Sequence, residues 1–232
     1  MGHVRQIGVI TGLAVEAQVL RRAVRLERLE DRIFIAACGG HKERIEDLAR
    51  TFAEHGADTL LSIGLAGALS SDLKTSSLVV PRKIVFEGGP EFPTDPGLVA
   101  LIAQGLGPQV GHGGDLLCVA SEVASRDEKK RLAAVTGAVA VDMESGHLAR
   151  AAGEIGLAFA VLRIILDEAA DCLPHSTLGL MRPDGTTDPV KLFKNLARRP
   201  ADLLPLVGLM ADLIGALNRL RRVARQVFRQ FF

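Results

Sequence analysis

Acidic side chains follow two apolar segments in the second half of the chain. Asp142 and Glu144 come after a short apolar run, and Asp167 comes directly after the apolar stretch at residues 157–166. Residues 143–155 have apolar side chains at helical spacing, which predicts a strand–helix–strand unit whose strands run the same way. The carboxyl ends of such strands form the edge where open α/β sheets bind ligands. Carboxylates gathered there are suited to proton transfer and to stabilising a developing positive charge.

Glu16 and Arg163 are two further charged residues that could belong to this edge. Glu16 stands in the first turn of a helix predicted over residues 15–23, directly after a strand predicted over residues 6–11. An acid at that position also complements the helix dipole without any further role. Arg163 interrupts the apolar stretch at residues 157–166. A buried arginine is either half of an ion pair or a group that steers a reactant.

The composition is that of an ordinary globular protein. Hydrophobic residues make up 48%, charged residues 24%, and the net charge of +1 gives no reason to expect nucleic acid as a partner. The absence of Trp and Tyr excludes base stacking on those rings. Cys38, Cys118 and Cys172 lack metal-ligand spacing and cannot all pair, which favours a reducing compartment. We expect no metal site, and the first ten residues lead into a strand pattern without a signal peptide.

Strand and helix patterns alternate along the chain and predict its fold class. Further strand patterns lie at residues 32–38, 59–63, 77–86 and 116–120, and further helix patterns lie at residues 41–56, 95–106 and 125–135. Pro81 interrupts the pattern at 77–86, which predicts an edge strand or a bend there. The strand pattern at 59–63 is followed by a predicted turn of small residues, which would let the backbone approach a ligand. We expect one domain over residues 1–232, with a three-layer α/β/α architecture and a mixed, mainly parallel central sheet.

The C-terminal segment, residues 200–232, predicts a helix that is strongly apolar and ends in a basic stretch. Three roles are open for it: packing on the sheet, contact with an anionic membrane surface, or contact within an oligomer. No apolar run reaches about 18–20 residues, so we expect no transmembrane helix. The loop before it, residues 172–187, has a length typical of lids and binding segments.

Four short motifs occur in order along most of the chain. They read IGVITGLAVE at residues 7–16, GLAGA at 64–68, VDME at 141–144 and RIILD at 163–167. Together they resemble the purine nucleoside phosphorylase and methylthioadenosine/S-adenosylhomocysteine nucleosidase superfamily. Within it, LP at residues 173–174 and MRPDGTTD at 181–188 resemble the hopanoid-associated phosphorylases. Those enzymes act on adenosylhopane, a triterpenoid that carries adenosine through its 5′ carbon.

The resemblance implies a nucleoside phosphorylase-like fold and assigns roles to the matching residues. Asp167 would protonate N7 of the purine, while Glu16 and Arg163 would hold or steer the nucleophile. Glu144 would bind the ribose hydroxyls, with Met143 packed on the sugar face. For Glu144 and Asp167 the alternative is a helix-capping role. The other positions that the resemblance assigns to substrate binding are Asp142, Gly64, Leu65, Ala66, Gly67 and Ser125.

Several positions depart from the pattern of the superfamily. Leu166 replaces a serine, Leu65 replaces a hydroxyl residue, and Ser125 stands where an aromatic side chain usually faces the base. Ser62 replaces an arginine of the hexameric bacterial phosphorylases, and TGL at residues 11–13 replaces their Gly-Asp-Pro turn. The phosphate site of the phosphorylases is therefore not visible. Either other groups hold phosphate, or water is the nucleophile.

The leading hypothesis is an enzyme that cleaves the N-glycosidic bond of a 5′-substituted adenosine, releasing adenine from adenosylhopane in hopanoid biosynthesis. One alternative is hydrolysis of methylthioadenosine or S-adenosylhomocysteine, and another is a nucleoside-binding protein without catalysis. No cofactor is expected, with inorganic phosphate as an optional co-substrate. The expected partners are a small-molecule or lipid-linked adenosine and a second copy of the chain, forming a dimer. The expected location is the cytoplasm, with peripheral contact to the inner face of the membrane as a further hypothesis.

Overall fold

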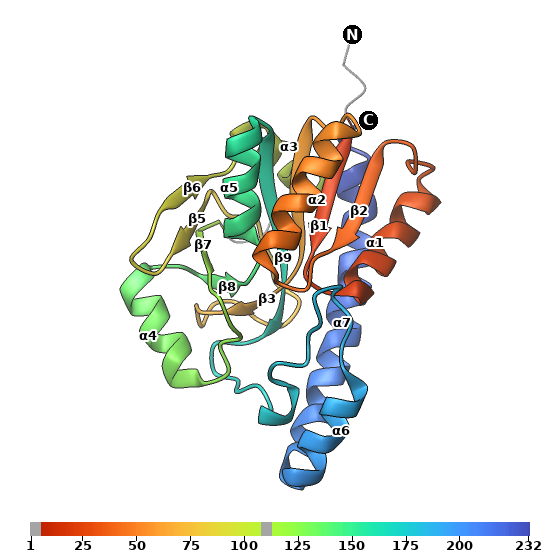
Figure 1. The fold of residues 1–232 in the computed structure, drawn as a ribbon. Helices are drawn as coiled ribbons and strands as arrows, with labels where there is room; N and C mark the ends of the chain where they lie inside the picture. Colours follow the sequence, from red (N-terminus) through yellow and green to blue (C-terminus); the bar gives the residue numbers. More distant parts are fainter. Residues whose placement is uncertain (1–5, 108–112) are drawn as a thin grey trace.

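The computed structural model describes residues 6–107 and 113–232, and within them nine strands form one mixed sheet flanked by helices (Figure 1). The strands are β1 (Ile7–Thr11), β2 (Ile33–Ala37), β3 (Thr59–Ala68), β4 (Leu78–Val79), β5 (Lys83–Phe86), β6 (Glu91–Pro93), β7 (Asp115–Cys118), β8 (Ala140–Asp142) and β9 (Ala158–Asp167). The expectation about a signal peptide concerns in part residues 1–5, which lie outside the described residues.

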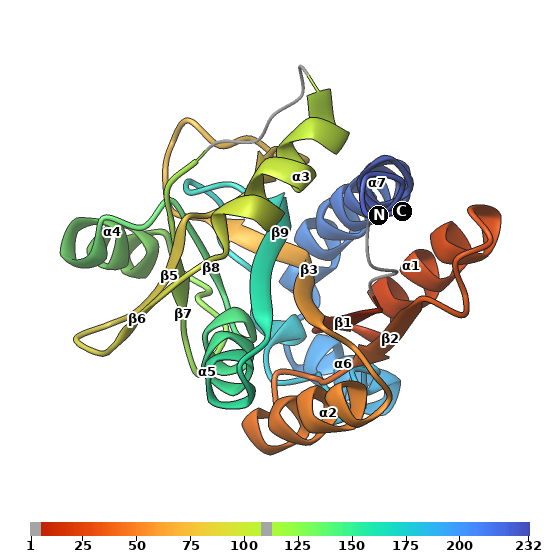
Figure 2. The ribbon, with the colours of Figure 1, turned by 90° about the horizontal axis from the view of Figure 1, so that it is seen from above.

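Helices cover both faces of the sheet (Figure 2). They are α1 (Ala14–Leu26), α2 (Lys42–Glu54), α3 (Pro96–Leu106), α4 (Arg126–Thr136), α5 (Ser145–Ile155), α6 (Pro189–Arg198) and α7 (Leu203–Phe228), with 3₁₀ turns at His175–Thr177 and Pro200–Asp202. One apolar core lies between the sheet and α1, α3 and α7, and another lies between the sheet and α2 and α5. The predicted three-layer architecture is therefore confirmed.

The strand order is β2-β1-β3-β8-β7-β5-β6, and β9 pairs with β3 and with β4. Five of these pairs are parallel: β1 with β2, β1 with β3, β3 with β9, β5 with β7, and β7 with β8. The pairs β3 with β8, β4 with β9, and β5 with β6 are antiparallel. The prediction of a mixed, mainly parallel sheet is thus confirmed.

One local prediction was wrong and another is confirmed. The small residues from Gly64 to Ala68 are not a turn, because they continue β3 and pair with β9 on one side and β8 on the other. The strand pattern at 77–86 is interrupted at Pro81, as expected, and forms the two strands β4 and β5, since proline cannot donate a hydrogen bond to a neighbouring strand.

The strands β8 and β9 are not parallel neighbours, which corrects the predicted geometry of the strand–helix–strand unit. Strand β3 lies between them, antiparallel to β8 and parallel to β9. Gly67 pairs with Val141 of β8 and with Asp167 of β9, and a β-bulge after Ala66 leaves Leu166 outside the regular register. The ends of β8 and β9 therefore still meet, but they meet across β3.

Helix α7 has two halves with different surroundings. Its second half is buried in the core through Ala216, Leu220, Val223, Ala224, Val227 and Phe228. Its first half extends with α6 beyond the body of the molecule (Figure 1). The segment Pro200–Phe228 is long and apolar enough to cross a membrane by length and composition, and only 6% of its most apolar window is buried. Length and composition alone do not make it a membrane span, and because its second half is packed in the core, the absence of a transmembrane helix stays a prediction.

The contact between α3 and α7 gives a test of the packing. A Cβ atom at Gly105 would lie 2.9 Å from the Cα atom of Val227 and 3.1 Å from the carbonyl oxygen of Gln226. Because backbone atoms cannot move aside, we expect Gly105→Ala to lower the free energy of unfolding by about 1–3 kcal/mol in urea denaturation. The matched control is Gly153→Ala in α5, where no atom lies within 4 Å, and this variant should be neutral or stabilised. Equal effects of the two variants would contradict the close packing of α3 on α7.

Candidate active site

Arg163 lies at the centre of a buried polar network where β3, β8, β9 and α5 meet. Its side chain has no exposed surface. Nε and Nη2 donate to Oδ2 of Asp142 at 2.8 and 2.6 Å, and Nη2 also donates to the hydroxyl oxygens of Ser62 and Ser145 at 2.7 and 3.0 Å. A fully buried guanidinium needs this set of acceptors, because removing it from water costs several kcal/mol. The ion-pair role expected for a buried arginine is therefore present.

Asp142 is the structural partner of this arginine. Besides the bonds from Arg163, its carboxylate accepts hydrogen bonds from the backbone N–H of Ser145 at 3.2 Å and from the hydroxyl of the same residue. These bonds hold the start of α5 against the end of β8. Although Asp142 lines the cavity described below, its acceptor positions are largely used within the protein. Its geometry fits positioning of Arg163 better than direct binding of a ligand.

Glu16 is buried and joins two parts of the chain. Its carboxylate accepts hydrogen bonds from the backbone N–H of Leu13 at 2.8 Å and of Leu65 at 2.7 Å. Burial is the main cause that raises the pKa of Glu16 above its usual value. The bond to Leu13 is the helix-start role expected for an acid here, and the bond to Leu65 ties α1 to β3.

Glu16 and Arg163 also approach one point above Gly64. A Cβ atom at Gly64 would lie 2.9 Å from Oε1 of Glu16 and 3.0 Å from Nη1 of Arg163. Among the described residues, Nη1 has no hydrogen-bond partner. A residue larger than glycine at position 64 would therefore displace the side chains of Glu16 and Arg163. The predicted role of Gly64 in substrate binding stays a prediction.

Glu144 and Met143 lie on the same side of the network. Oε2 of Glu144 is 3.5 Å from Nη2 of Arg163, and Oε1 lies 2.6 Å from where a Cβ atom of Gly12 would stand. Burial, followed by repulsion from Asp142, raises the pKa of Glu144 to about 8. Met143 places its methyl group over Gly40. Glu144 is therefore a carboxyl group that can hold a proton near neutral pH.

Asp167 lies at the opposite wall and is paired with a lysine. Its Oδ2 accepts a hydrogen bond from Nζ of Lys129, which comes from α4 and is 1% exposed. Burial raises the pKa of Asp167, and the charge of Lys129 works against that rise. A Cβ atom at Gly67 would be only 3.3 Å from Oδ2, so the glycine allows the close approach of β3.

A cavity opens between these two walls. Its lining combines apolar side chains with the acids, and consists of Leu65, Ala66, Gly67, Val119, Ser121, Glu122, Val123, Val141, Asp142, Met143, Glu144, Leu166, Asp167 and Leu173. The structure thus brings together Asp142, Met143, Glu144 and Asp167 with Leu65, Ala66 and Gly67 of β3. The other predicted residues Gly64, Glu16 and Arg163 lie next to one another but do not line the cavity. A mostly apolar cavity with a few converging acids is the usual form of a small-molecule site.

Ser125 does not line this cavity, contrary to the prediction for it. Its side chain accepts a hydrogen bond from the backbone N–H of Glu128 at 3.2 Å and so caps α4. Ser125 lines a neighbouring hollow that shares the wall at residues 119–123 with the cavity. The capping-box spacing in the sequence was the correct signal at this position.

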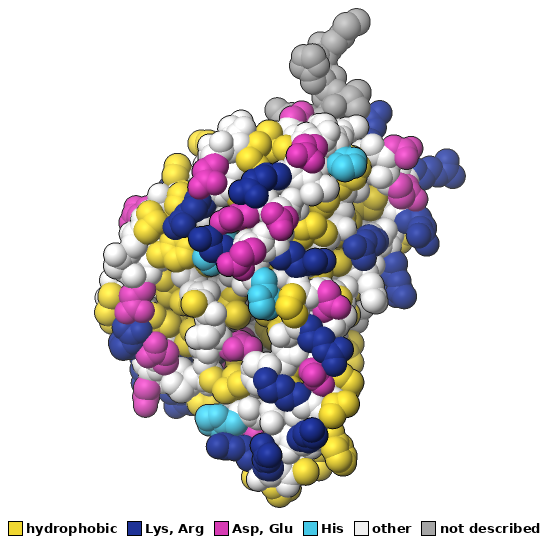
Figure 3. All heavy atoms as spheres, viewed as in Figure 1, with side chains coloured by type: hydrophobic (Ala, Val, Ile, Leu, Met, Phe, Trp, Pro, Cys, Tyr) yellow, Lys and Arg dark blue, Asp and Glu magenta, His cyan; other side chains and the backbone are white. Residues whose placement is uncertain are grey.

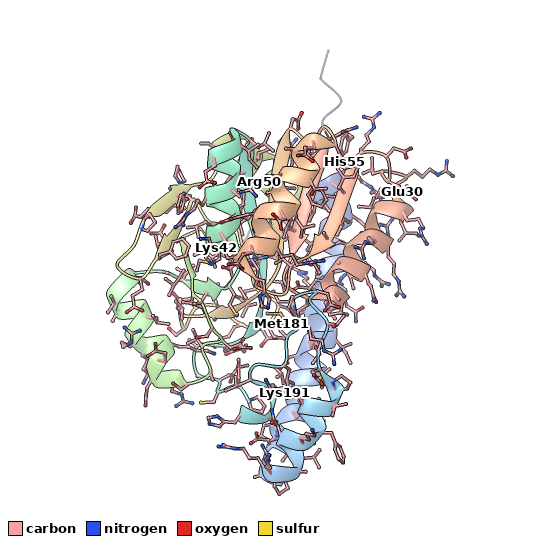
Figure 4. All side chains as sticks on the ribbon, viewed as in Figure 1. Glu30, Lys42, Arg50, His55, Met181 and Lys191 are labelled. Atoms are coloured by element: carbon pink, nitrogen blue, oxygen red, sulfur yellow. The ribbon has the colours of Figure 1, made fainter. Side chains whose placement is uncertain are left out.

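The loop after β9 closes one side of the site. Gly185 accepts a hydrogen bond at its carbonyl oxygen from the backbone N–H of Ala14 at 2.8 Å. A Cβ atom at Gly185 would lie 2.6 Å from the carbonyl oxygen of Gly12. Met181, labelled in Figure 4, lies between the sheet and Lys191 of α6. The start of α1 is therefore covered by backbone of the same chain.

A comparison with models of protein families identifies the superfamily of the chain. A model described as the phosphorylase superfamily matches residues 7–199. The chain belongs to this superfamily. The predicted kind of enzyme, a purine nucleoside phosphorylase or nucleosidase, is thereby confirmed at the level of the superfamily. A search of curated proteins finds no match.

Solved structures of the superfamily share the fold. The futalosine hydrolase of Helicobacter pylori is 17% identical, with a TM-score of 0.68 and coverage of 98% of this chain and 97% of that chain. The S-adenosylhomocysteine nucleosidase of Streptococcus pyogenes is 19% identical, with a TM-score of 0.67 and the same coverage. The 5′-methylthioadenosine/S-adenosylhomocysteine nucleosidase of Helicobacter pylori, in a complex with an inhibitor, is 20% identical, with a TM-score of 0.63 and coverage of 85% of this chain and 100% of that chain.

Lys129 is the site residue that sequence reasoning missed. It lies in a helix of charged residues, RDEKKRLAAVT, where lysine usually points to solvent. The sequence shows only that Lys129 stands one turn after the residue that caps α4. Nothing in this local pattern indicates that its partner is Asp167, 38 residues later in the chain. For metals, residues 6–107 and 113–232 contain no group of three or more His, Cys, Asp or Glu that could hold an ion.

The raised pKa of Glu144 predicts how stability depends on pH. Because its folded pKa of about 8 lies above its usual value of 4.5, the folded state binds the proton more tightly than the unfolded state does. Its contribution to stability is full below about pH 4.5 and is lost as the pH rises through 8. We expect the free energy of unfolding to fall between pH 5 and 8, and to fall less steeply in Glu144→Gln.

Urea denaturation at several pH values measures this slope. The control is Glu54→Gln, an exposed position at the end of α2, which should keep the slope of the wild-type protein. A slope in Glu144→Gln equal to that of the wild type would show that this carboxyl does not titrate in the range.

Proposed function

We propose that this protein hydrolyses the N-glycosidic bond of a 5′-substituted adenosine and releases adenine, and that the 5′ substituent is long and apolar, as in adenosylhopane. The observation that carries the proposal is that two buried carboxyl groups with different surroundings, those of Glu144 and Asp167, line one cavity. Arg163 contacts Glu144 and lies next to Glu16, although neither Arg163 nor Glu16 lines the cavity. Breaking this bond needs both a proton for the base and negative charge beside the sugar.

The two walls suit the two charges that develop in the reaction. As the bond breaks, positive charge builds on the ribose ring and negative charge builds on the purine. Glu144 would bind the ribose hydroxyls, with Met143 packed on the sugar, and above its pKa of about 8 it would also place negative charge next to the ring. Asp167, whose pKa burial raises, would give its proton to N7, so that adenine leaves as a neutral molecule.

Water rather than phosphate fits the sugar side of the cavity. Three carboxyl groups there, those of Glu16, Asp142 and Glu144, surround the guanidinium of Arg163, which already forms an ion pair with Asp142. A phosphate dianion would find the charge of this guanidinium already balanced by Asp142. Ser62, the position of an arginine in the hexameric phosphorylases that the sequence resembles, is here an acceptor for Arg163.

Backbone donors at the start of α1 are also occupied. The N–H groups of Leu13 and Ala14 donate to Glu16 and to Gly185, so neither is free to bind an anion. By contrast, Oε1 of Glu16 and Nη1 of Arg163 flank the point above Gly64, and they can hold a water between them. Glu16, with its raised pKa, would take the proton from the attacking water.

The surroundings of the cavity favour an apolar 5′ substituent. Its wall includes Val119, Val123, Leu166 and Leu173. Ser176, three residues after Leu173, bonds to Asn195 of α6 and to Asp202 before α7. The segment that follows Leu173 is therefore tied to α6 and to the start of α7, which carry exposed apolar residues.

Adenine release decides the proposal. We would measure it from a 5′-alkyl adenosine with a long apolar group and from methylthioadenosine, each with and without phosphate. We expect release from the long substrate at the same rate in both buffers. Faster release from methylthioadenosine would favour the alternative nucleosidase function, which the fold of the compared nucleosidases supports. Dependence on phosphate would contradict hydrolysis, and no release from either substrate would favour a nucleoside-binding protein.

Asp167→Asn tests the assignment of the acid. An amide cannot supply the proton, so we expect adenine release to fall by about 100-fold or more. The matched control is Glu168→Gln, because this neighbouring carboxylate bonds to Lys74 and Thr75 away from the cavity. A fall of much less than 100-fold in Asp167→Asn would remove Asp167 from the role of general acid.

The exposed apolar residues of α6 and α7 support a peripheral contact with a membrane. We call them the apolar tip, which comprises Val190, Phe193, Leu203, Leu204, Val207, Met210 and Ile214. In Figure 3 apolar atoms gather along the part of the molecule that α6 and α7 form, with basic side chains beside them. Lys194, Arg198 and Arg199 are exposed there and form no ion pair within the described residues. Apolar and basic groups side by side fit an anionic membrane surface.

The basic end of α7 does not belong to this surface, which corrects the expectation from sequence. Arg225 and Arg229 form ion pairs with Glu27 of α1 at 2.6 Å, in the half of the helix that is packed in the core. The cations of the proposed membrane contact come from α6 instead. With a substrate anchored in the inner leaflet, the enzyme would work in the cytoplasm, and a dimer remains part of the proposal.

Sedimentation with lipid vesicles tests the apolar tip. We expect the protein to bind vesicles containing about 30% anionic phospholipid, and salt to weaken the binding. Phe193→Ser and Leu204→Ser should each weaken binding about tenfold, because each removes a buried apolar side chain worth about 1.5–3 kcal/mol. The control is Val135→Ser, which removes an exposed apolar side chain of α4 outside the apolar tip. Unchanged binding, or self-association through the same residues without vesicle binding, would overturn this contact.

A further inference from the structure

Lys129 is the most completely buried cation of the described residues after Arg163. It is 1% exposed, although lysine is rarely buried without a specific partner. Its ammonium donates to Oδ2 of Asp167, to the carbonyl oxygen of Glu168 at 2.6 Å, and to that of Asp171 at 3.1 Å. All three acceptors belong to the end of β9 and the turn that follows it.

The number of acceptors fits a protonated amine. An ammonium group offers three N–H donors and no acceptor, and three acceptors surround this one. Arg126, one turn earlier in α4, donates to the carbonyl oxygen of Ala170 at 2.7 and 2.9 Å. Helix α4 therefore holds the turn after Asp167 through two cations, so the position of the carboxylate is fixed from outside the cavity.

Other charged groups near Asp167 act differently from Lys129. Asp171 raises the pKa of Asp167 by repulsion. Glu168 turns away to bond with Lys74. On the cavity side, Glu122, Asp142 and Glu144 are acidic as well. Lys129 is thus the cation that balances a group of acids around the proposed proton donor.

We propose that Lys129 is a positioning residue of the reaction, which holds Oδ2 of Asp167 so that Oδ1 faces the purine, and stabilises the carboxylate that forms when Asp167 gives up its proton. The proposal rests on the proposed function. In this step the O–H bond of Asp167 breaks and an N7–H bond forms, while the electron pair of the C1′–N9 bond moves to the purine. Water adds its oxygen to C1′ and gives a proton to Glu16, and once adenine has left, Glu16 releases that proton to solvent while Asp167 takes one up from solvent.

The proposal has a consequence for the pH profile. The acid must be protonated before the reaction, so the rate falls as the pH rises through the pKa of Asp167. The charge of Lys129 lowers this pKa and burial raises it. Without the charge the pKa moves further up, so the falling limb of the profile moves to higher pH. The maximal rate also drops, because the carboxylate left behind loses its counter-charge.

The experiment compares kcat/KM for adenine release between pH 5 and 10 in four proteins. These are the wild type, Lys129→Met, Lys129→Arg, and the control Lys130→Met, whose lysine is exposed. We expect Lys129→Met to lower the maximum about 10- to 100-fold and to move the falling limb up by about one pH unit or more. Lys129→Arg keeps the positive charge, so kcat/KM should fall at nearly the same pH as in the wild type. If Lys129→Met folds and its kcat/KM falls at the same pH as that of the wild type, the proposal is overturned.

A double-mutant cycle separates positioning from a general effect on folding. In the background of Asp167→Asn, we expect Lys129→Met to cause little further loss, because the group it acts on is gone. A loss equal to that in the wild-type background would show that Lys129 does not act through Asp167. If Lys129→Met does not fold, Lys129→Gln replaces it as a neutral donor to the two carbonyls. Failure of both to fold would assign the residue to stability and overturn the proposal.

The proposed function and this inference can fail separately. Adenine release by the wild-type protein is measured first, and its absence would count against the function alone. When release is present, the position of the falling limb in the Lys129 variants decides the inference.

Discussion

The buried charge of Arg163 is the constraint on which the site depends. A guanidinium without exposed surface must be compensated by the protein, and Asp142, Ser62 and Ser145 supply the acceptors. These partners come from β8, β3 and α5, so satisfying one side chain fixes four elements relative to one another. The same requirement keeps position 64 a glycine, because Nη1 lies against it. With Asp142 bound to Arg163, Glu144 is the carboxyl group on this side that lines the cavity and is left for a ligand.

Two buried cations divide the acids of the cavity into two groups with different chemistry. Arg163 gathers the carboxyl groups on the sugar side, whereas Lys129 meets Asp167 from the opposite side. Burial raises the pKa values of Glu16, Glu144 and Asp167, but the charges around each group differ. Separate surroundings of this kind let one cavity contain both a proton donor and groups that carry negative charge.

The sequence predicts the acids of the site better than it predicts the geometry that joins them. Asp142, Glu144 and Asp167 follow buried apolar runs, so their placement at strand ends could be foreseen from the local pattern. The sequence pattern predicted that these acids meet because their strands run the same way in one strand–helix–strand unit. This was wrong, since β3 lies between β8 and β9. Gly67, predicted in a turn, is in fact the residue that pairs with both strands. Such pairing depends on contacts about 75 to 100 residues apart in the chain, and local composition does not record them.

Helix α4 contains one residue whose contact could be predicted from the sequence, Ser125, and one whose contact could not, Lys129. The cap at Ser125 is a local hydrogen bond, and the spacing of the sequence predicts it. The burial of Lys129 depends on the turn after β9, which covers the helix only when the chain is folded. A long-range contact therefore turns a residue of surface type into the partner of the proposed acid. A long-range contact also changes the start of α1. The carbonyl oxygen of Gly185 accepts a hydrogen bond from the backbone N–H of Ala14, a donor that an anion would need. In the proposed reaction the occupied backbone donors would favour water over phosphate, and the apolar wall with Val119, Val123 and Leu173 would contact the substrate.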